Sequence, residues 1–307
     1  MTEYLRIGRR DVKLTHPDKV LFAKAGLTKL DLARHYERVA EVMLPYVRER
    51  PLALQAFPDG IDGDGFFMKA VPRYFPGWVD RVTVDKKGGT VTHVLANDAA
   101  TLVYLAGQNV VTPHQWLSRA DEPRKPDRLI MDFDPSGGGF AHVRAAARDA
   151  GDRLRDAGLE VYAMVTGSRG IHVISPLRRG AGFSEVHRFA RAMAEEMVRD
   201  NPKRLTLEWR KTDRGSKIFV DVNRNAYAQH AVSPYGVRAR PRAPVAAPVH
   251  WEELADGSLK PDRWTVKTIG GRVDGEGDPW KGMGRRGRKL PQAAPNIDGR
   301  HGRRDRI

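Results

Sequence analysis

Cysteine is absent from the 307-residue chain. Without thiols the protein has no disulfide, no cysteine nucleophile and no thiolate-bound zinc or iron–sulfur centre, so any metal ion must be held by oxygen or imidazole ligands. Long apolar runs are also missing, since no stretch approaches the roughly 18 apolar residues that a membrane-spanning helix needs. The opening residues, MTEYLRIGRRDVKL, lack the apolar centre of a secretory signal. These absences predict a cytoplasmic protein with no membrane partner.

Acidic residues are too few to balance the basic ones. The sequence has 53 Lys and Arg against 38 Asp and Glu, which gives a formal charge of +15. Such a surplus is typical of proteins that bind phosphate-rich partners, although a basic surface that merely keeps a protein soluble has the same composition. Nine basic residues and two acids lie in the Gly-rich segment 281–307, which we predict to be a flexible tail.

Hydrophobic periodicity predicts two helices in the first half. TKLD at Thr28 is typical of a helix cap, and apolar residues follow at helical spacing as far as Met43, with Pro45 and Pro51 closing this unit. A shorter helix is expected at 97–108, with Asn97 as its cap.

The second half alternates strands and helices. We expect strands at 129–134, 159–165, 171–175, 205–209 and 217–222, with helices at 140–154 and 183–197. Mixed strands covered by helices predict an α/β (α+β) fold.

Two aspartates, Asp132 and Asp134, form the clearest chemical pattern. They end the expected strand 129–134, where alternation puts both carboxylates on one face with Cα atoms roughly 6 to 7 Å apart. Their hard oxygens suit Mg²⁺ or Mn²⁺, which phosphoryl transfer uses to neutralise a triphosphate and activate the attacking hydroxyl. Two solvated acids at a strand end would have the same pattern.

A third aspartate, Asp221, lies on another apolar strand (KIFVDV), on the same side as Phe219. A carboxylate in such a strand is either paired or functional, and an ion pair with one of the many arginines is the plain alternative. Three strand aspartates in one half of the chain nevertheless favour a metal site.

The turn TGSRGIHV, residues 166–173, joins two of the expected strands. Gly167 and Gly170 allow a tight turn that presents N–H groups to an anion, and Thr166, Ser168 and Arg169 add donors. His172 follows on the next strand as a further donor, although a lone strand histidine is more often structural.

Arginines follow Asp221 within a few residues. Arg224, Arg238 and Arg240 lie in the segment NRNAYAQHAVSPYGVRARP, where alternation puts Arg238 and Arg240 on the same side, and the planar fork of arginine suits phosphate oxygens. A solvated basic face is the alternative, but the closeness to a carboxylate strand favours substrate ligands.

Taken together, DFD at 132–134, TGSRGIH at 166–172 and FVDVNRNAYAQHAVSPYGVRARP at 219–241 resemble the primase-type polymerase domain of bacterial DNA ligase D, within the archaeo-eukaryotic primase superfamily. The resemblance runs from LTHPDKVLF near Leu14 to GDPW near Pro279. It implies a single domain over 1–280, built as a primase-like core of mixed β-sheets covered by helices. Residues 1–125 would contact a 5′-phosphate and the template, and an RRM-like half at 126–280 would be catalytic.

The resemblance also implies roles for individual residues. Asp132, Asp134 and Asp221 would be the catalytic ligands of two Mn²⁺ or Mg²⁺ ions. The residues implied to hold the nucleotide are Thr166, Ser168, Arg169, His172, Arg224, Arg238 and Arg240. Those implied to contact DNA are His16, Lys19 and Lys29 at a 5′-phosphate and Phe66, Phe67 and Lys69 at the template, where stacking on aromatic rings tolerates any base. Lys29 directly follows the Thr28 cap, where the free amides and the dipole of the helix favour an anion.

Two positions depart from the family pattern. Thr166 replaces the usual serine but keeps its hydroxyl, whereas His16 stands where asparagine is common. The chain is too short for the ligase and nuclease domains of a full ligase D, so it resembles stand-alone members.

The implied function is template-dependent addition of nucleotides, with ribonucleotides preferred, to a primer 3′-hydroxyl at gapped or broken DNA bearing a 5′-phosphate. The implied setting is the bacterial nucleoid, and the implied partners are repair proteins such as Ku or a ligase. A primase that starts chains without a primer would use the same carboxylates, and a non-catalytic nucleic-acid-binding protein would keep them as structural groups.

Overall fold

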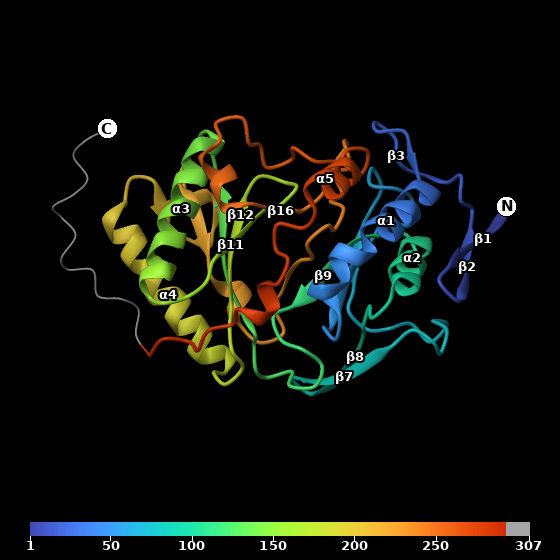
Figure 1. Cartoon of the computed structure of the whole chain (residues 1–307), viewed down its shortest axis with the longest axis horizontal. Helices are drawn as coiled ribbons and strands as arrows, with labels where there is room; N and C mark the ends of the chain where they lie inside the picture. The colour runs from blue at the N-terminus through green and yellow to red at the C-terminus, as the bar shows by residue number, and fades with distance from the viewer. Residues whose placement is uncertain (293–307) are drawn as a thin grey trace.

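A computed structural model describes residues 1–292 and contains two six-stranded sheets, each with its own pair of helices (Figure 1). The mixed α/β fold predicted from the sequence is confirmed. No helix within those residues is long and apolar enough to cross a membrane.

The first half of the chain builds one sheet and two hairpins. Its elements are β1 (Thr2–Ile7), β2 (Arg10–Thr15), β3 (Val20–Phe22), β4 (Leu27–Thr28), α1 (Lys29–Val47), β5 (Leu52–Ala56), β6 (Phe66–Met68), β7 (Arg81–Lys86), β8 (Gly89–Val94), α2 (Ala99–Gly107) and β9 (Val110–Trp116). The sheet has the order β9-β5-β8-β7, with β6 paired to β5, and a strand from the second half, β15 (His230–Val232), pairs with the other side of β9. Helices α1 and α2 pack together beside it, on the right in Figure 1.

The second half builds the other sheet. Its elements are β10 (Arg128–Pro135), α3 (Phe140–Asp156), β11 (Tyr162–Val165), β12 (Ile171–Pro176), α4 (Phe183–Asp200), β13 (Leu205–Thr206), β14 (Ile218–Asp221), β15 (His230–Val232), β16 (Ala247–Val249) and α5 (Ile269–Glu276), with short 3₁₀ turns that include η2 (Asn223–Asn225) and η4 (Met283–Arg285). The strand order is β13-β14-β10-β12-β11-β16.

The chain order β10-α3-β11-β12-α4-β14 with the spatial order β14-β10-β12-β11 is the antiparallel β-α-β-β-α-β arrangement of RRM-like folds. Helices α3 and α4 lie side by side beyond this sheet, on the left in Figure 1. Because their apolar stripes cover one face of the sheet, the opposite face is left for polar side chains.

Helix α1 begins where the sequence predicts. The Thr28 side chain accepts a hydrogen bond from the Asp31 amide, and the Asp31 carboxylate accepts one from the Thr28 amide. The helix passes through the first of the two predicted closing prolines, Pro45, and ends at Val47, before the second, Pro51. A proline has a helical φ, but it removes its own backbone hydrogen bond and crowds the carbonyl four residues earlier. Because Pro45 lies in the last turn and the apolar face of α1 is buried, the helix continues past it.

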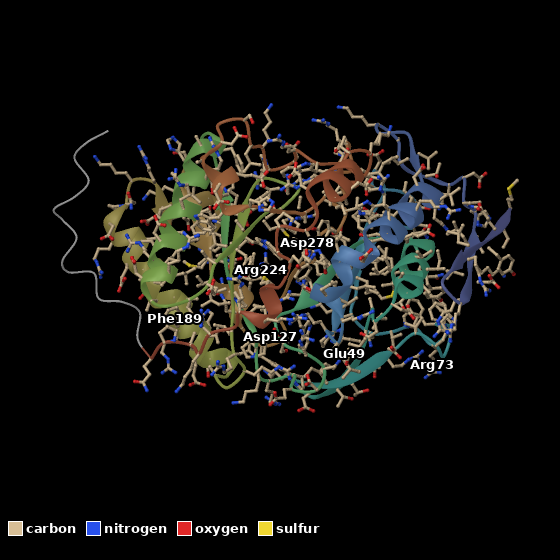
Figure 2. The ribbon with its side chains drawn as sticks, in the orientation of Figure 1. Glu49, Arg73, Asp127, Phe189, Arg224 and Asp278 are labelled. Carbon is tan, nitrogen blue, oxygen red and sulfur yellow. The ribbon has the colours of Figure 1, made fainter. Side chains whose placement is uncertain are left out.

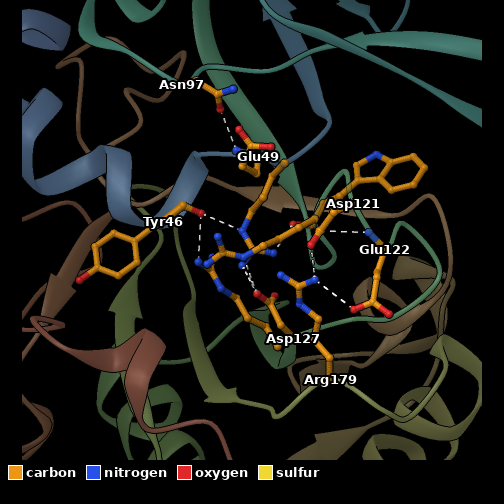
Figure 3. Close-up of polar contacts among 11 residues, drawn as sticks. Tyr46, Glu49, Asn97, Asp121, Glu122, Asp127 and Arg179 are labelled. Atoms are coloured by element: carbon orange, nitrogen blue, oxygen red, sulfur yellow. Dashed lines mark hydrogen bonds and ion pairs between the residues drawn. The ribbon is translucent and has the colours of Figure 1, made fainter.

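The predicted cap of α2 is also wrong. Asp98 is the cap and accepts a hydrogen bond from the Thr101 amide at 2.7 Å. Asn97 instead accepts from the Glu49 amide at 2.8 Å, which ties α2 to the end of α1 (Figure 3). The sequence offers two adjacent capping residues, and the contact with a distant segment decides between them.

Expected strands in the second half are shorter than predicted at three places. The strands expected at 159–165, 205–209 and 217–222 are 162–165, 205–206 and 218–221. Periodicity locates the apolar residues, but a strand lasts only as long as it has a neighbour to pair with.

The two halves are joined by a buried ion-pair network. Arg50, at the start of the first sheet and only 1% exposed, donates to the Asp127 carboxylate at 2.7 Å, and Arg119 donates to it at 3.1 Å. Beyond it, Arg179 reaches both Asp121 and Glu122 at the surface (Figure 3). These contacts hold the entry to β10 against the N-terminal sheet.

The first part of the predicted tail is packed against the domain instead of being flexible. Met283 is buried, and the Arg288 backbone pairs with the end of β12, accepting from the Arg178 amide at 2.7 Å and donating to the Pro176 carbonyl at 3.2 Å. The domain therefore continues past the predicted boundary at 280. The remainder of the predicted tail, 293–307, lies outside the described residues.

Candidate active site

Three neighbouring strands place two aspartates and a histidine side by side. In the registers of β14, β10 and β12, Asp132 lies directly opposite Asp221 on one side and His172 on the other. Directly opposed residues share a face of the sheet, and all three side chains are at least 90% buried. His172 Nε2 lies 3.4 Å from the Asp132 carboxylate.

Asp134 follows two residues along β10, on the face predicted from strand alternation, and lies opposite Phe219. Its pKa is raised to about 6, first by the negative charge of Asp132 and then by burial. Two carboxylates that resist joint ionisation form a site that favours a cation.

A positively charged side chain of the protein itself lies beside these carboxylates. Arg224, on η2, places Nε 3.6 Å from the carboxylates of both Asp132 and Asp221. Burial lowers the pKa of Arg224, but the charges of Asp132 and Asp221 outweigh it and raise the pKa above its ordinary value. Figure 2 shows Arg224 in the middle of the molecule, between α4 and α1.

The Asp132 carboxylate is ionised and only partly paired. Burial acts to raise its pKa, but the charges of His172, Arg224 and Arg238 outweigh burial and hold it below the ordinary value. Its Oδ1 atom is buried without a hydrogen-bond partner. Such an orphaned carboxylate oxygen fits a hard metal ion, although within residues 1–292 no three His, Asp or Glu side chains form a ready-made metal cage.

The turn between β11 and β12 is a closed loop with little space. The Thr166 amide donates to the Gly170 carbonyl at 3.1 Å, and the Thr166 hydroxyl accepts from the Gly170 amide at 3.2 Å. A Cβ on Gly170 would lie 2.4 Å from the Phe133 carbonyl oxygen, so only glycine lets the turn approach β10. Thr166 is thus buried and shapes the turn, which leaves Ser168 and the exposed Arg169 at its rim.

Two of the predicted arginines gather on that turn. Arg238 donates to the Thr166 carbonyl at 2.7 Å, and Arg240 donates to the Ser168 hydroxyl at 2.8 Å. They share a side as predicted, although the backbone there forms bends and not a strand. Burial lowers the pKa of Arg238 despite the opposing charge of Asp132.

The predicted template aromatics lie on β6. Phe66 and Phe67 are 48% and 45% exposed, and the ring of Phe67 contacts those of His114 (5.2 Å) and His230 (5.4 Å). Lys69 is exposed beside them. The pKa of His114 is held well below its ordinary value, first by burial and then by neighbouring positive charges that include Arg224 and Arg238. The aromatic platform and the carboxylate site are therefore close neighbours.

The predicted 5′-phosphate residues also lie together, with one correction. His16 and Lys19 share a turn in which the Lys19 amide donates to the His16 carbonyl at 3.1 Å. The first amide of α1, that of Lys29, donates to the Lys19 carbonyl at 2.8 Å and is not free for an anion, contrary to the prediction. The amide that the start of the helix was expected to offer to a phosphate is therefore already bound by the turn that holds Lys19.

Lys29 is buried, and its ammonium donates to the Thr15 carbonyl at 2.9 Å. Burial lowers its pKa, and the charge of nearby Lys19 adds to the effect. Lys19 is more accessible and lies 3.5 Å from the exposed Asp59. Lys19 is therefore the better placed of the two lysines to meet a phosphate.

Sequence reasoning missed three residues beside the site: His114, His230 and Asn225. Both histidine rings are half-buried and contact the ring of Phe67 as well as each other. Asn225, the residue after Arg224, is fully buried. Only Asn225 had a signal in the sequence, since it ends the NRN group that follows Asp221.

Comparisons with known proteins agree with this geometry. The family described as the primase-polymerase domain of LigD matches residues 28–280. The multifunctional non-homologous end joining protein LigD of Mycobacterium bovis is 34% identical over 258 residues, and that of Pseudomonas aeruginosa is 31% identical over 279 residues. The alignments cover 81% and 90% of this chain, which spans about a third of the length of either relative.

A solved structure extends the likeness to three dimensions. The polymerase domain of Mycobacterium tuberculosis ligase D, determined in complex with DNA, is 32% identical with a TM-score of 0.84. The match covers 92% of this chain and 99% of that domain.

Proposed function

The chain belongs to the LigD primase-polymerase domain family, and from that premise we propose that it adds nucleotides to a primer 3′-hydroxyl, directed by a template, at gaps or ends in broken DNA. The observation that carries the proposal is the cluster of the buried Asp132, Asp221 and His172 with the partly exposed Arg224, set between the β11–β12 turn and the exposed Phe67. End joining, named for the full-length relatives, is part of this proposal.

The family is metal-dependent, and Asp132, Asp134 and Asp221 are the residues that would hold two divalent ions. Bound there, Mn²⁺ or Mg²⁺ would neutralise the triphosphate and lower the pKa of the attacking hydroxyl. The charges of His172 and Arg224 outweigh burial and hold the pKa of Asp132 below its ordinary value, which favours the charged carboxylate that a metal ion binds. The preference for Mn²⁺ is our proposal and is settled by adding each ion separately.

The remaining polar residues would bind the nucleotide. Ser168, Arg169 and Arg240 stand at the rim of the β11–β12 turn, where an anionic triphosphate meets donors and positive charge. His172 lies deeper, 3.4 Å from Asp132, and Arg238 is held on the Thr166 carbonyl within range of the Asp132 charge, so both would orient the phosphate nearest the reaction. No covalent enzyme intermediate is needed, because the primer hydroxyl attacks the α-phosphate directly.

The test is primer extension on a gapped duplex with a 5′-phosphate, with and without Mn²⁺ or Mg²⁺, offering ribonucleotides and deoxyribonucleotides separately. We expect metal-dependent extension that copies the template and is faster with ribonucleotides. Extension of a template lacking any primer would identify a primase, and binding without extension under every condition would overturn the proposal.

We propose in addition that the turn holding His16 and Lys19 binds the 5′-phosphate at the far side of a gap. The ammonium groups of Lys19 and of the buried Lys29 put two positive charges on one turn, at the start of α1. Ku or a ligase is the partner class that such a gap-filling activity would serve.

Lys19→Ala should weaken binding to a gap with a 5′-phosphate about tenfold, within the roughly 1–3 kcal/mol range of charge-assisted hydrogen bonds. Fluorescence anisotropy at one salt concentration measures it, because the general electrostatic term is then constant. The affinity for a gap that ends in a 5′-hydroxyl should fall less than twofold. Lys24→Ala, on an exposed lysine of the same region, is the matched control. Equal losses on both gaps would assign Lys19 to the diffuse basic surface.

A further inference from the structure

Asn225 makes three hydrogen bonds at the centre of the catalytic half while having no exposed surface. Its Oδ1 accepts from the Ile130 amide at 2.9 Å, and its Nδ2 donates to the Ile130 carbonyl at 2.7 Å and to the Val222 carbonyl at 2.9 Å. One side chain therefore binds both backbone groups of a residue on β10 and also the chain that leaves β14.

These contacts replace a missing piece of the sheet. Strand β14 pairs with β10 from Pro135 back to Asp132 and ends there, so Ile130 has no strand partner on that side. A carboxamide has the same donor and acceptor as a peptide group, and Asn225 uses them as a strand residue would. Buried backbone groups left unpaired are destabilising, so this position requires such a side chain.

The neighbouring residue is Arg224, whose position depends on the same turn. Turn η2 is fixed at one end by the Asn223 amide, which donates to the Asp221 carboxylate at 2.8 Å, and at the other by the three bonds of Asn225. Between these two anchors, Arg224 extends to lie 3.6 Å from both Asp132 and Asp221. A long side chain on a loose turn would spread over many rotamers.

We propose that Asn225 is a positioning residue for nucleotide addition, because it clamps η2 to β10 and so holds the Arg224 guanidinium between the Asp132 and Asp221 carboxylates. The inference rests on the proposed polymerase function and deepens it. It makes Asn225 act only through Arg224, which separates it from a residue that serves stability alone.

The experiment compares Asn225→Ser with Asn223→Ser. Both remove a carboxamide from the same turn, but Asn223 is exposed and Asn225 is buried. In primer extension, Asn225→Ser should lower kcat/KM for the nucleotide about tenfold, and Asn223→Ser should change it less than twofold. Placed in an Arg224→Gln background, Asn225→Ser should cause no further loss beyond about twofold, because the group it positions is gone.

A second readout does not depend on activity. Without nucleotide, Arg224→Gln should bind Mn²⁺ more tightly, since a competing cation has left the carboxylates, and Asn225→Ser should shift the Mn²⁺ Kd in the same direction. Electron paramagnetic resonance of free Mn²⁺ measures both. The Mn²⁺ measurement is valid for any variant that circular dichroism shows to be folded.

The outcomes separate the two proposals. Equal losses from Asn225→Ser in both backgrounds, or an unchanged Mn²⁺ Kd beside a shifted one for Arg224→Gln, would overturn the positioning role while the polymerase function stands. A parent protein without extension activity would remove the function, and the Mn²⁺ measurement would still decide whether Asn225 places Arg224. If Asn225→Ser does not fold, Asn225→Gln takes its place, since it keeps a neutral carboxamide and displaces it by one methylene group.

Discussion

Asp132→Asn should reduce nucleotide addition by roughly a thousandfold or more while leaving DNA binding almost unchanged, because it removes several kcal/mol of metal-mediated stabilisation of the transition state. Asp132 is the centre of the site, opposed by Asp221 and His172 and approached by Arg224. Asparagine keeps the shape but not the charge, so the sheet should persist. Single-turnover primer extension measures the loss.

The matched control is Asp62→Asn, which removes the same charge from an exposed loop. It should extend primers at the parent rate and bind gapped DNA with the parent affinity. The affinity of Asp132→Asn for DNA should also stay near the parent value, because the Asp132 carboxylate is buried and its negative charge does not attract phosphate. Extension by Asp132→Asn at a rate near that of the parent would remove the central claim about the site.

Asp127→Ala should destabilise the folded protein by about 3–5 kcal/mol, the range for breaking a buried ion pair by removing one partner. The carboxylate is contacted by Arg50 at 2.7 Å and by Arg119 at 3.1 Å, and Arg50 is only 1% exposed. Without it, buried positive charges face one another, and the pKa of Arg128 is already lowered to about 9 by burial and by Arg50. Urea unfolding of parent and variant gives the difference.

The control for this prediction is Asp121→Ala, which breaks an ion pair with Arg179 in the same network (Figure 3). Asp121 is 58% exposed, and an exposed pair contributes at most about 1 kcal/mol because water screens it. Similar destabilisation by Asp127→Ala and Asp121→Ala would show that burial does not set the strength of this network.

The ion pairs of Asp127 also predict a pH dependence. Burial acts to raise its pKa, but Arg50 and Arg128 outweigh it, so the pKa is lowered to about 2. The unfolded state takes up its proton near pH 4, before the folded state does. The stability contributed by Asp127 is therefore complete above about pH 4 and is lost as the pH falls towards 2, a dependence that Asp127→Ala should lack.

Local patterns predicted the elements of the site well. Strand alternation placed Asp132 and Asp134 on one face, and the apolar run around Asp221 located its strand. They failed where a contact from a distant part of the chain decides the outcome, as at Asn97, which binds Glu49 instead of capping α2. The prediction that the Lys29 amide is free for an anion failed in the same way, because the Lys19 carbonyl already accepts its hydrogen bond.

The sequence by itself determined which residue types were available for chemistry: no thiols, three strand aspartates, a glycine turn and a surplus of arginine. Periodicity reports only the face on which a residue lies, because it follows from backbone geometry within one element. The order of strands in a sheet depends on pairing between distant segments. Only the tertiary structure could therefore set Asp221 and His172 on either side of Asp132, and bury Asn225 where β14 ends.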